Sequence, residues 1–384
     1  MVVVYYVNTY YLDAAIETIQ AIKGQVELHV VIELSPESKT SNIIDIDQLG
    51  KFSHIETAEA VLGELKWREF GHYFNGVASV HFAIHRFKKS YSVTSLLTAA
   101  KIWNYIKSLK PDLIHFDSIS TRVLGLYPFL IKKKLFITIH DPVPHTGEES
   151  WKIKLIEYLF YPLAKGLFFY SDFAKQQFNQ HYTDIGAKRY IIRFQPFSYI
   201  KQFSKNLLKD SNAILFFGRI LPYKGVDLLL RAIPQVLMNY PDQLFVIAGK
   251  PFNCELDKEI LRNYKDNILV IPEHISTEEL AALIKKSKFI VCPYRDATQS
   301  GVLMTTYALG KMVLGTNVGA FPEYIHDGIN GLLTAPDAAS IAGTIIRALD
   351  SDYFKELQKN VTDSYSESTG AENRQIILTA YQTS

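Results

Sequence analysis

Strand-like and helix-like segments alternate along the whole chain, and this alternation limits the fold more than any other feature. Apolar, β-favouring runs such as VVVYYV at 2–7 are followed by stretches with helical spacing of apolar residues, such as DAAIETIQAI at 13–22. The second half repeats this order from AILFFGR at 213–219 to MVLGT at 312–316. Because this βαβα order is typical of parallel strands, we predict an α/β protein whose parallel sheets are covered by helices on both faces.

Two local signals predict where the chain divides and where one helix begins. A chain of 384 residues is long enough for two cores, and residues 198–212, SYIKQFSKNLLKDSN, are polar and follow neither pattern. We therefore predict an N-terminal domain, a linker and a C-terminal domain at 1–198, 199–212 and 213–365. Ser276 and Glu279 fit a capping box in front of the helix STEELAALIKKS.

Composition and charge exclude several classes of protein. The hydrophobic fraction of 48% and the net charge of +2 are those of an ordinary globular protein, with no basic run to indicate nucleic-acid binding. Cys254 and Cys292 form no CxxC pair or His/Cys cluster, so we expect buried thiols in a reducing compartment and no metal site. The start, MVVVYYVN, is too short for a signal sequence, and no apolar run reaches about 18 residues. We therefore expect a cytoplasmic protein without a membrane span.

The segment ILFFGRILPYKG at 214–225 predicts an anion site. Its apolar start indicates a buried strand, Gly218 permits backbone angles that other residues avoid, and the residues that follow have helical spacing. In open α/β sheets ligands bind at the carboxyl ends of strands, where Arg219 and Lys224 would lie beside a helix N-terminus. The alternative is a pair of ordinary surface cations.

Residues 214–333 resemble the retaining GT-B glycosyltransferases of family 4. The resemblance rests on five segments in the family order, GRILPYKGVDLLLRA, LFVIAGK, STEELAALIKKSKFIVCPY, ALGKMVLGT and VGAFPEYIHDGINGLL. The N-terminal half matches in layout and in ITIHD at 137–141. The resemblance implies two doubly wound Rossmann-like domains that face each other across a cleft. It also implies that residues 366–384 form a final helix that crosses back to the N-terminal domain.

The chain departs from the family where two glutamates with seven residues between them are usual. These positions fall on Ala297 and Thr305, and the sequence there reads RDATQSGVLMTTYALG. A TQSG loop in place of the first glutamate resembles a subgroup of bacterial surface-polysaccharide enzymes. We therefore expect altered handling of the donor sugar.

The resemblance implies a donor site in the C-terminal half. Arg219 and Lys224 are expected to bind a diphosphate and to stabilise its charge as it leaves. The other expected donor-binding residues are Gly218, Thr298, Gln299, Ser300, Gly301, Val302, His274 and Glu323. The alternative for residues 298–301 is a helix cap and turn. For Glu323 the alternative is a contact with the dipole of the helix that it begins.

Strand ends in the N-terminal half supply candidates near the acceptor. His140 ends the strand LFITIH, and we expect it to be a catalytic residue that orients the donor sugar; the alternative is a structural histidine. Asp117 closes the strand DLIHFD in the same way. Asn8 and Thr9 occupy the first strand-to-helix turn, where the family often has glycines, and His145 follows on the loop after His140. We assign all four of these to the acceptor side.

The stretch WKIKLIEYLFYPLAKG at 151–166 combines an apolar helical face with lysines, and IKKK at 131–134 adds positive charge. It predicts a core-packed helix with a solvated face. The alternative is a peripheral contact with the inner face of the cell membrane, which brings the protein to a lipid-linked acceptor.

The function implied by the resemblance is transfer of a sugar, with retention of configuration and without a metal, from a UDP- or GDP-type sugar nucleotide to a hydroxyl acceptor. The acceptor is expected to be a glycan or a lipid-linked molecule in surface polysaccharide or glycolipid assembly, and no further cofactor is expected. Two alternatives are a nucleotide-sugar epimerase of the same fold and a non-catalytic sugar-binding module.

Overall fold

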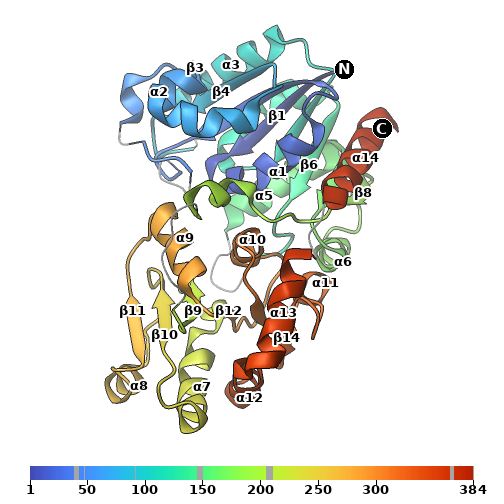
Figure 1. The fold of residues 1–384 in the computed structure, drawn as a ribbon. Coiled ribbons are helices and arrows are strands. Elements are labelled where there is room, and N and C mark those ends of the chain that lie inside the picture. The colour runs from blue at the N-terminus through green and yellow to red at the C-terminus, as the bar shows by residue number, and fades with distance from the viewer. Residues whose placement is uncertain are drawn as a thin grey trace.

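The computed structural model describes residues 1–38, 43–46, 48–90, 92–144, 150–204, 211–363 and 367–383. It contains two parallel-sheet domains, one above the other in Figure 1, with helices on both faces of each sheet. The predicted α/β class is therefore confirmed.

The N-terminal domain is built on an eight-stranded sheet with the order β3-β4-β2-β1-β5-β6-β7-β8. All neighbouring strands are parallel except β3 and β4, which pair antiparallel. The strands are β1 (Val2–Asn8), β2 (Glu27–Leu34), β3 (Ile55–Thr57), β4 (Ser79–Ile84), β5 (Leu113–Asp117), β6 (Leu135–Ile139), β7 (Ala164–Phe169) and β8 (Lys188–Ile191). The α-helices are α1 (Leu12–Ile22), α2 (Ala58–Phe70), α3 (Val93–Ser108), α4 (Tyr127–Leu130), α5 (Trp151–Phe160) and α6 (Asp172–His181).

The C-terminal domain is built on a six-stranded parallel sheet with the order β11-β10-β9-β12-β13-β14. Its strands are β9 (Ile214–Phe217), β10 (Phe245–Ala248), β11 (Ile268–Ile271), β12 (Phe289–Cys292), β13 (Val313–Thr316) and β14 (Gly331–Thr334). Its α-helices are α7 (Val226–Asn239), α8 (Lys258–Asn263), α9 (Thr277–Lys286), α10 (Gly301–Ala308), α11 (Phe321–Tyr324), α12 (Ala338–Leu349) and α13 (Ser351–Asp363). The capping box of Ser276 and Glu279 at α9 is confirmed.

The central strands are apolar on both faces because helices cover both sides of each sheet. Every residue of β9 is buried, as are the five central residues of β1. This double burial explains why these strands are continuous apolar runs without alternation. The helices bury one face each, as α7 does with Leu229, Ile233 and Val236.

The strand order reverses once in each sheet. In the first sheet the reversal lies between β1 and β5, and in the second between β9 and β12. Loops that leave such neighbours diverge to opposite faces of the sheet, so a crevice forms at their carboxyl ends. These two places position the candidate site.

The last helix, α14 (Glu367–Thr383), lies against the N-terminal domain beside β8 (Figure 1). The Tyr381 hydroxyl lies 2.5 Å from Nδ1 of His115 in β5, and Nε of Arg374 donates to the Ala21 carbonyl over 2.7 Å. The segment predicted as a polar linker begins with a 3-10 stretch, Ser198–Ser204, in which Tyr199 and Ile200 are buried. These apolar side chains join the core, so the described part of that segment is not a solvated tether.

Candidate functional site

The loop after β9 and the first turn of α10 meet at Gly218. This residue has a φ of 103°, and a Cβ atom there would lie 3.2 Å from both Nζ of Lys224 and Cγ2 of Val302. Gly225, with a φ of 66°, approaches the neighbouring loop so closely that a Cβ would lie 1.9 Å from the Pro293 carbonyl oxygen. Both positions require glycine, and they bring the loops after β9 and β12 together at the reversal point.

The two predicted cations differ in exposure. Lys224 is only 8% exposed, and its Nζ lies 5.4 Å from the centre of the Tyr294 ring, whereas Arg219 is exposed. Burial of the neighbouring Cys292 raises the pKa of its thiol to about 12, so this cysteine is neutral at physiological pH. Lys224 therefore supplies a largely desolvated positive charge, and Arg219 an exposed one.

An arginine and an aspartate hold the two loops in place. The Arg295 guanidinium donates to both carboxylate oxygens of Asp227 at 2.8 and 2.7 Å, and its backbone N–H donates to the Tyr223 carbonyl over 2.7 Å. The hydrogen bonds from Arg295 keep the pKa of Asp227 below its usual value. This pair was not expected from the sequence, because it joins residues 68 positions apart.

Each polar residue of the 298–300 loop has a different environment. Ser300 accepts a hydrogen bond from the Leu303 N–H at 3.2 Å, which is the helix cap considered as an alternative. Thr298 donates its hydroxyl to the carboxylate of Asp141 in the N-terminal domain. Oε1 of Gln299 is buried with no hydrogen-bond partner in the part of the chain that the structure describes. Ala297 and Thr305, at the positions of the family glutamates, are both buried.

On the N-terminal face, His140 and Asp117 form a buried pair. Nε2 of His140 lies 2.7 Å from Oδ1 of Asp117, and the imidazole stacks on Tyr11 with ring centres 3.9 Å apart. Oδ2 of Asp117 is buried, again with no partner among the described residues. His140 thus lies at the carboxyl edge of the sheet, where the sequence places it.

A cavity of about 290 Å³ opens beside this pair. His140, Asp141 and Ser118 line it from the sheet edge, and Ile153 and Glu157 line it from α5. Burial raises the pKa of the Glu157 carboxyl, and hydrogen bonds from Tyr182 and Tyr161 oppose this rise. Sequence reasoning missed Glu157 and Asp141; an acid on the apolar face of a helix was the signal for Glu157.

The side chains of Asn8 and Thr9 form hydrogen bonds within the N-terminal domain. Nδ2 of Asn8 donates to Oε1 of Glu33 over 2.9 Å, and the Thr9 hydroxyl donates to the Ser38 carbonyl over 2.7 Å. Burial raises the pKa of the Glu33 carboxyl, which also accepts from Tyr6 and Ser120. Glu33 was missed as well, although an acid near the end of the apolar run VELHVVIEL marked it.

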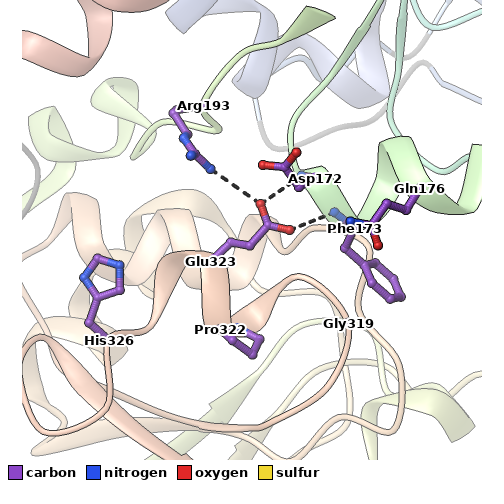
Figure 2. A pocket seen from close by; sticks show the side chains of 8 residues that line it. All are labelled: Asp172, Phe173, Gln176, Arg193, Gly319, Pro322, Glu323 and His326. Atoms are coloured by element: carbon purple, nitrogen blue, oxygen red, sulfur yellow. Dashed lines mark hydrogen bonds and ion pairs between the residues drawn. The ribbon is translucent and has the colours of Figure 1, made fainter. Parts of the chain in front are cut away.

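The remaining candidates lie in other places. The Glu323 carboxylate accepts from two backbone amides of α6 in the N-terminal domain and pairs with Arg193 (Figure 2). Glu323 therefore binds the N-terminus of α6, and it also lies in the first turn of its own helix α11, the position that the alternative gave it. His274 is exposed after β11, an edge strand two positions from β9, and His145 lies outside the described residues. Gly301 begins α10, and a Cβ atom added to it would lie 3.4 Å from the Phe197 ring.

Two features are absent from the described ranges. These ranges hold no group of three or more His, Cys, Asp or Glu residues arranged for a metal ion. None of their helices combines the length and the apolar character that a bilayer crossing demands.

Residues 211–351 match the family described as Glycosyl transferases group 1. The chain is 32% identical over 124 residues to the uncharacterized glycosyltransferase MJ1178 of Methanocaldococcus jannaschii. This alignment covers 32% of this chain and 34% of that protein. The chain is 28% identical over 150 residues to D-inositol 3-phosphate glycosyltransferase of Corynebacterium efficiens, which covers 37% and 35%. The match thus spans about a third of the length of both curated relatives.

The whole chain also matches solved structures. The structure of Anabaena Alr3699/HepE in complex with UDP and glucose superimposes with a TM-score of 0.66, at 15% identity, over 99% of this chain and 100% of that one. The protein therefore has the predicted GT-B fold, with two doubly wound domains. The match to the family described as Glycosyl transferases group 1 is confined to residues 211–351, which lie in the C-terminal domain.

Proposed function

We propose that this protein is a retaining, metal-independent glycosyltransferase that moves a sugar from a UDP- or GDP-type sugar nucleotide to a hydroxyl acceptor. The single observation that carries this proposal is the meeting of Gly218, Lys224 and Val302 at the reversal point of a group 1 domain. A buried cation and a helix N-terminus together favour a bound diphosphate.

The proposed reaction requires no nucleophile from the protein. The acceptor oxygen bonds to the anomeric carbon on the face from which the diphosphate departs, and a phosphate oxygen of the departing group takes the acceptor proton. Lys224 and Arg219 stabilise the negative charge that grows on the diphosphate. The raised pKa of Cys292, about 12, agrees with this scheme because no thiolate is supplied there.

The sugar is proposed to lie between the two domains. Oε1 of Gln299 is proposed to bind the sugar from the C-terminal side, since this buried atom has no partner in the described ranges and a ligand would satisfy it. His140, fixed by Asp117, orients the sugar from the N-terminal side. The bond between Thr298 and Asp141 supports this arrangement, because it joins the two loops directly.

The acceptor is proposed to be a glycan or a lipid-linked molecule, in the assembly of surface polysaccharide or glycolipid. Helix α5 exposes Trp151 at 70% and Tyr158 at 75%, with Lys152 and Lys154 on the same helix. Aromatic residues with lysines favour an anionic lipid surface. Because Ile153 and Glu157 of α5 also line the His140 cavity, this surface would bring an acceptor hydroxyl to the site.

A two-stage experiment tests the proposed function. First, melting temperature is measured with UDP, GDP and ADP; a ligand at about 100 times its dissociation constant should stabilise the fold by about 2.7 kcal/mol. Second, the sugar nucleotide of the stabilising base is incubated with a panel of glycan and lipid acceptors in the presence of EDTA. We expect a glycoside whose anomeric configuration matches that of the donor.

Other outcomes would point elsewhere. A changed sugar nucleotide formed without any acceptor would indicate the epimerase. Ligand binding without turnover for every donor and acceptor would indicate a binding module. Inversion of configuration, or loss of activity with EDTA and recovery with a divalent ion, would overturn the retaining, metal-independent scheme.

A further inference from the structure

The first turn of α6 is capped by a carboxylate from the other domain. The Asp172 N–H donates to Oε2 of Glu323 over 2.8 Å, and the Phe173 N–H donates to Oε1 over 2.8 Å (Figure 2). The Ala174 N–H donates to the Ser171 hydroxyl over 3.0 Å. Because the first amides of a helix have no partner within it, Glu323 completes a cap that the N-terminal domain does not supply by itself.

An arginine and a tyrosine extend this contact. The Arg193 guanidinium lies 3.4 Å from Oε2 of Glu323 (Figure 2), and the Asn373 side chain in α14 binds both the N–H and the carbonyl of Arg193, at 2.7 and 2.8 Å. Tyr324, next to Glu323, donates its hydroxyl to the Tyr170 carbonyl at the end of β7. Helix α11 is therefore joined both to the corner between β7 and α6 and to the place where α14 contacts β8.

The same corner contacts the loop proposed to bind the donor sugar. The Ser171 hydroxyl donates to the Thr298 carbonyl over 3.2 Å. Within the C-terminal domain, the Ala320 N–H donates to the Ala297 carbonyl over 2.7 Å. The residue before α11 is thus bonded to the residue before the 298–300 loop, and both α11 and this loop contact residues 170–173 of the N-terminal domain.

We propose that Glu323 is a positioning residue: by binding the α6 amides, it holds the domains in the closed arrangement in which the 298–300 loop faces His140 and Asp141. The proposal rests on the proposed function and goes beyond it, because Glu323 acts through α6 and touches no substrate. Loss of the carboxylate leaves Lys224 and Arg219 in place but makes the closed arrangement less populated. Transfer should therefore slow while nucleotide affinity is retained.

The test compares Glu323→Ala with Glu323→Gln and with a matched control, Asp337→Ala. Asp337 accepts from the Ser340 N–H at 2.9 Å and caps α12 within one domain, so its loss removes a cap without touching the domain contact. Hydrogen–deuterium exchange of residues 170–176 reports the α6 amides directly. We expect faster exchange there in Glu323→Ala, a smaller increase in Glu323→Gln, which keeps one acceptor oxygen, and none in Asp337→Ala.

Kinetics provide the second readout. With the sugar nucleotide that supports turnover, we expect kcat of Glu323→Ala to fall about 10- to 100-fold, the equivalent of one lost charge-assisted hydrogen bond. The affinity for the free nucleotide diphosphate should stay within about twofold of wild type, because Lys224 and Arg219 are unchanged. A twofold change in the dissociation constant corresponds to less than about 0.5 kcal/mol of binding free energy. Asp337→Ala should keep the wild-type kcat.

Three results would overturn the inference. These are unchanged exchange at residues 170–176 in Glu323→Ala, an unchanged kcat in that variant, or a loss of nucleotide affinity as large as the loss of kcat. The last result would place Glu323 at the donor itself. If the wild-type protein transfers no sugar, the proposed function fails, whereas faster exchange in Glu323→Ala would still support the domain contact.

Discussion

Nε2 of His140 and Oδ1 of Asp117 lie 2.7 Å apart at the carboxyl ends of the neighbouring strands β6 and β5. Both side chains are buried, so the pair is held in a fixed geometry at the edge of the sheet. Because the Asp117 carboxylate accepts a hydrogen bond from Nε2 of His140, the orientation of the imidazole depends on Asp117. The hydrogen bond between His140 and Asp117 thus joins the ends of two strands at the edge of the sheet that faces the C-terminal domain.

Asp117→Asn should lower the rate of sugar transfer about 10- to 100-fold, since a hydrogen bond to a charged group is worth about 1.5–3 kcal/mol. Nucleotide affinity should not change, because the diphosphate residues lie in the other domain. The matched control is Asp112→Asn, which alters an exposed aspartate bonded to the Val2 N–H just before β5. Steady-state kinetics with both variants check this prediction; equal rates in the two would contradict it.

Arg219→Ala and Lys224→Met should each reduce transfer about 10²- to 10³-fold and weaken nucleotide binding, as expected for loss of a preorganised charge stabiliser. Methionine is chosen for Lys224 because the side chain is buried and its stem must still fill the space under Tyr294. Arg262→Ala, on the exposed face of α8, is the control. Wild-type affinity in both site variants, measured by calorimetry, would remove the diphosphate assignment.

Gln299→Ala should lower activity without lowering stability, whereas Ser300→Ala should lower stability. The buried Oε1 of Gln299 has no hydrogen-bond partner among the residues that the structure describes, so loss of the side chain should leave the melting temperature almost unchanged but lower kcat/KM about 10- to 100-fold. Ser300 caps α10, so Ser300→Ala should destabilise the fold by about 1 kcal/mol. Nucleotide diphosphate should still bind to both variants. Unaltered sugar transfer by Gln299→Ala would exclude this loop from the donor-sugar site.

The Asp227–Arg295 pair predicts a dependence of stability on pH. The folded-state pKa of Asp227 is lowered, so its contribution is present above the pKa of the unfolded chain, about 3.9, and is lost as the pH falls through the folded value. Asp227→Asn should therefore lower the melting temperature at pH 7 and progressively less below about pH 4. The pair is partly exposed, so we expect about 1 kcal/mol at most. A constant difference from pH 7 to pH 3 would contradict this cause.

Sedimentation with vesicles tests the proposed lipid contact of α5. Anionic vesicles should retain the protein at low salt and release it as salt rises, because charges are screened within about 10 Å at 0.1 M. Lys152→Gln combined with Lys154→Gln should abolish retention, and Trp151→Ser should weaken it at every salt concentration. The control changes the exposed Lys258 and Lys265 of the other domain to glutamine. Absence of sedimentation by the wild-type protein would leave α5 as an ordinary core-packed helix.

Local signals predicted much of the fold. The periodicity of apolar residues indicated parallel sheets with helices on both faces, and the Ser276–Glu279 capping box at α9 followed from a spacing of three residues. Gly218 and Lys224 could be placed on one loop because they are six positions apart. In each case the partners lie close in the sequence, where backbone geometry alone fixes their relation.

The tertiary structure alone decided which of these segments meet across the molecule. Glu323 binds the Asp172 N–H from 151 positions away, and Thr298 reaches Asp141 from 157 positions away. The sequence contains the acid and the helix start, but no periodicity or cap signal pairs one with the other. The sequence by itself determined the elements and their buried faces, because these depend on backbone preferences and apolar spacing. Only the packing of two finished domains determined which carboxylate lies against which helix.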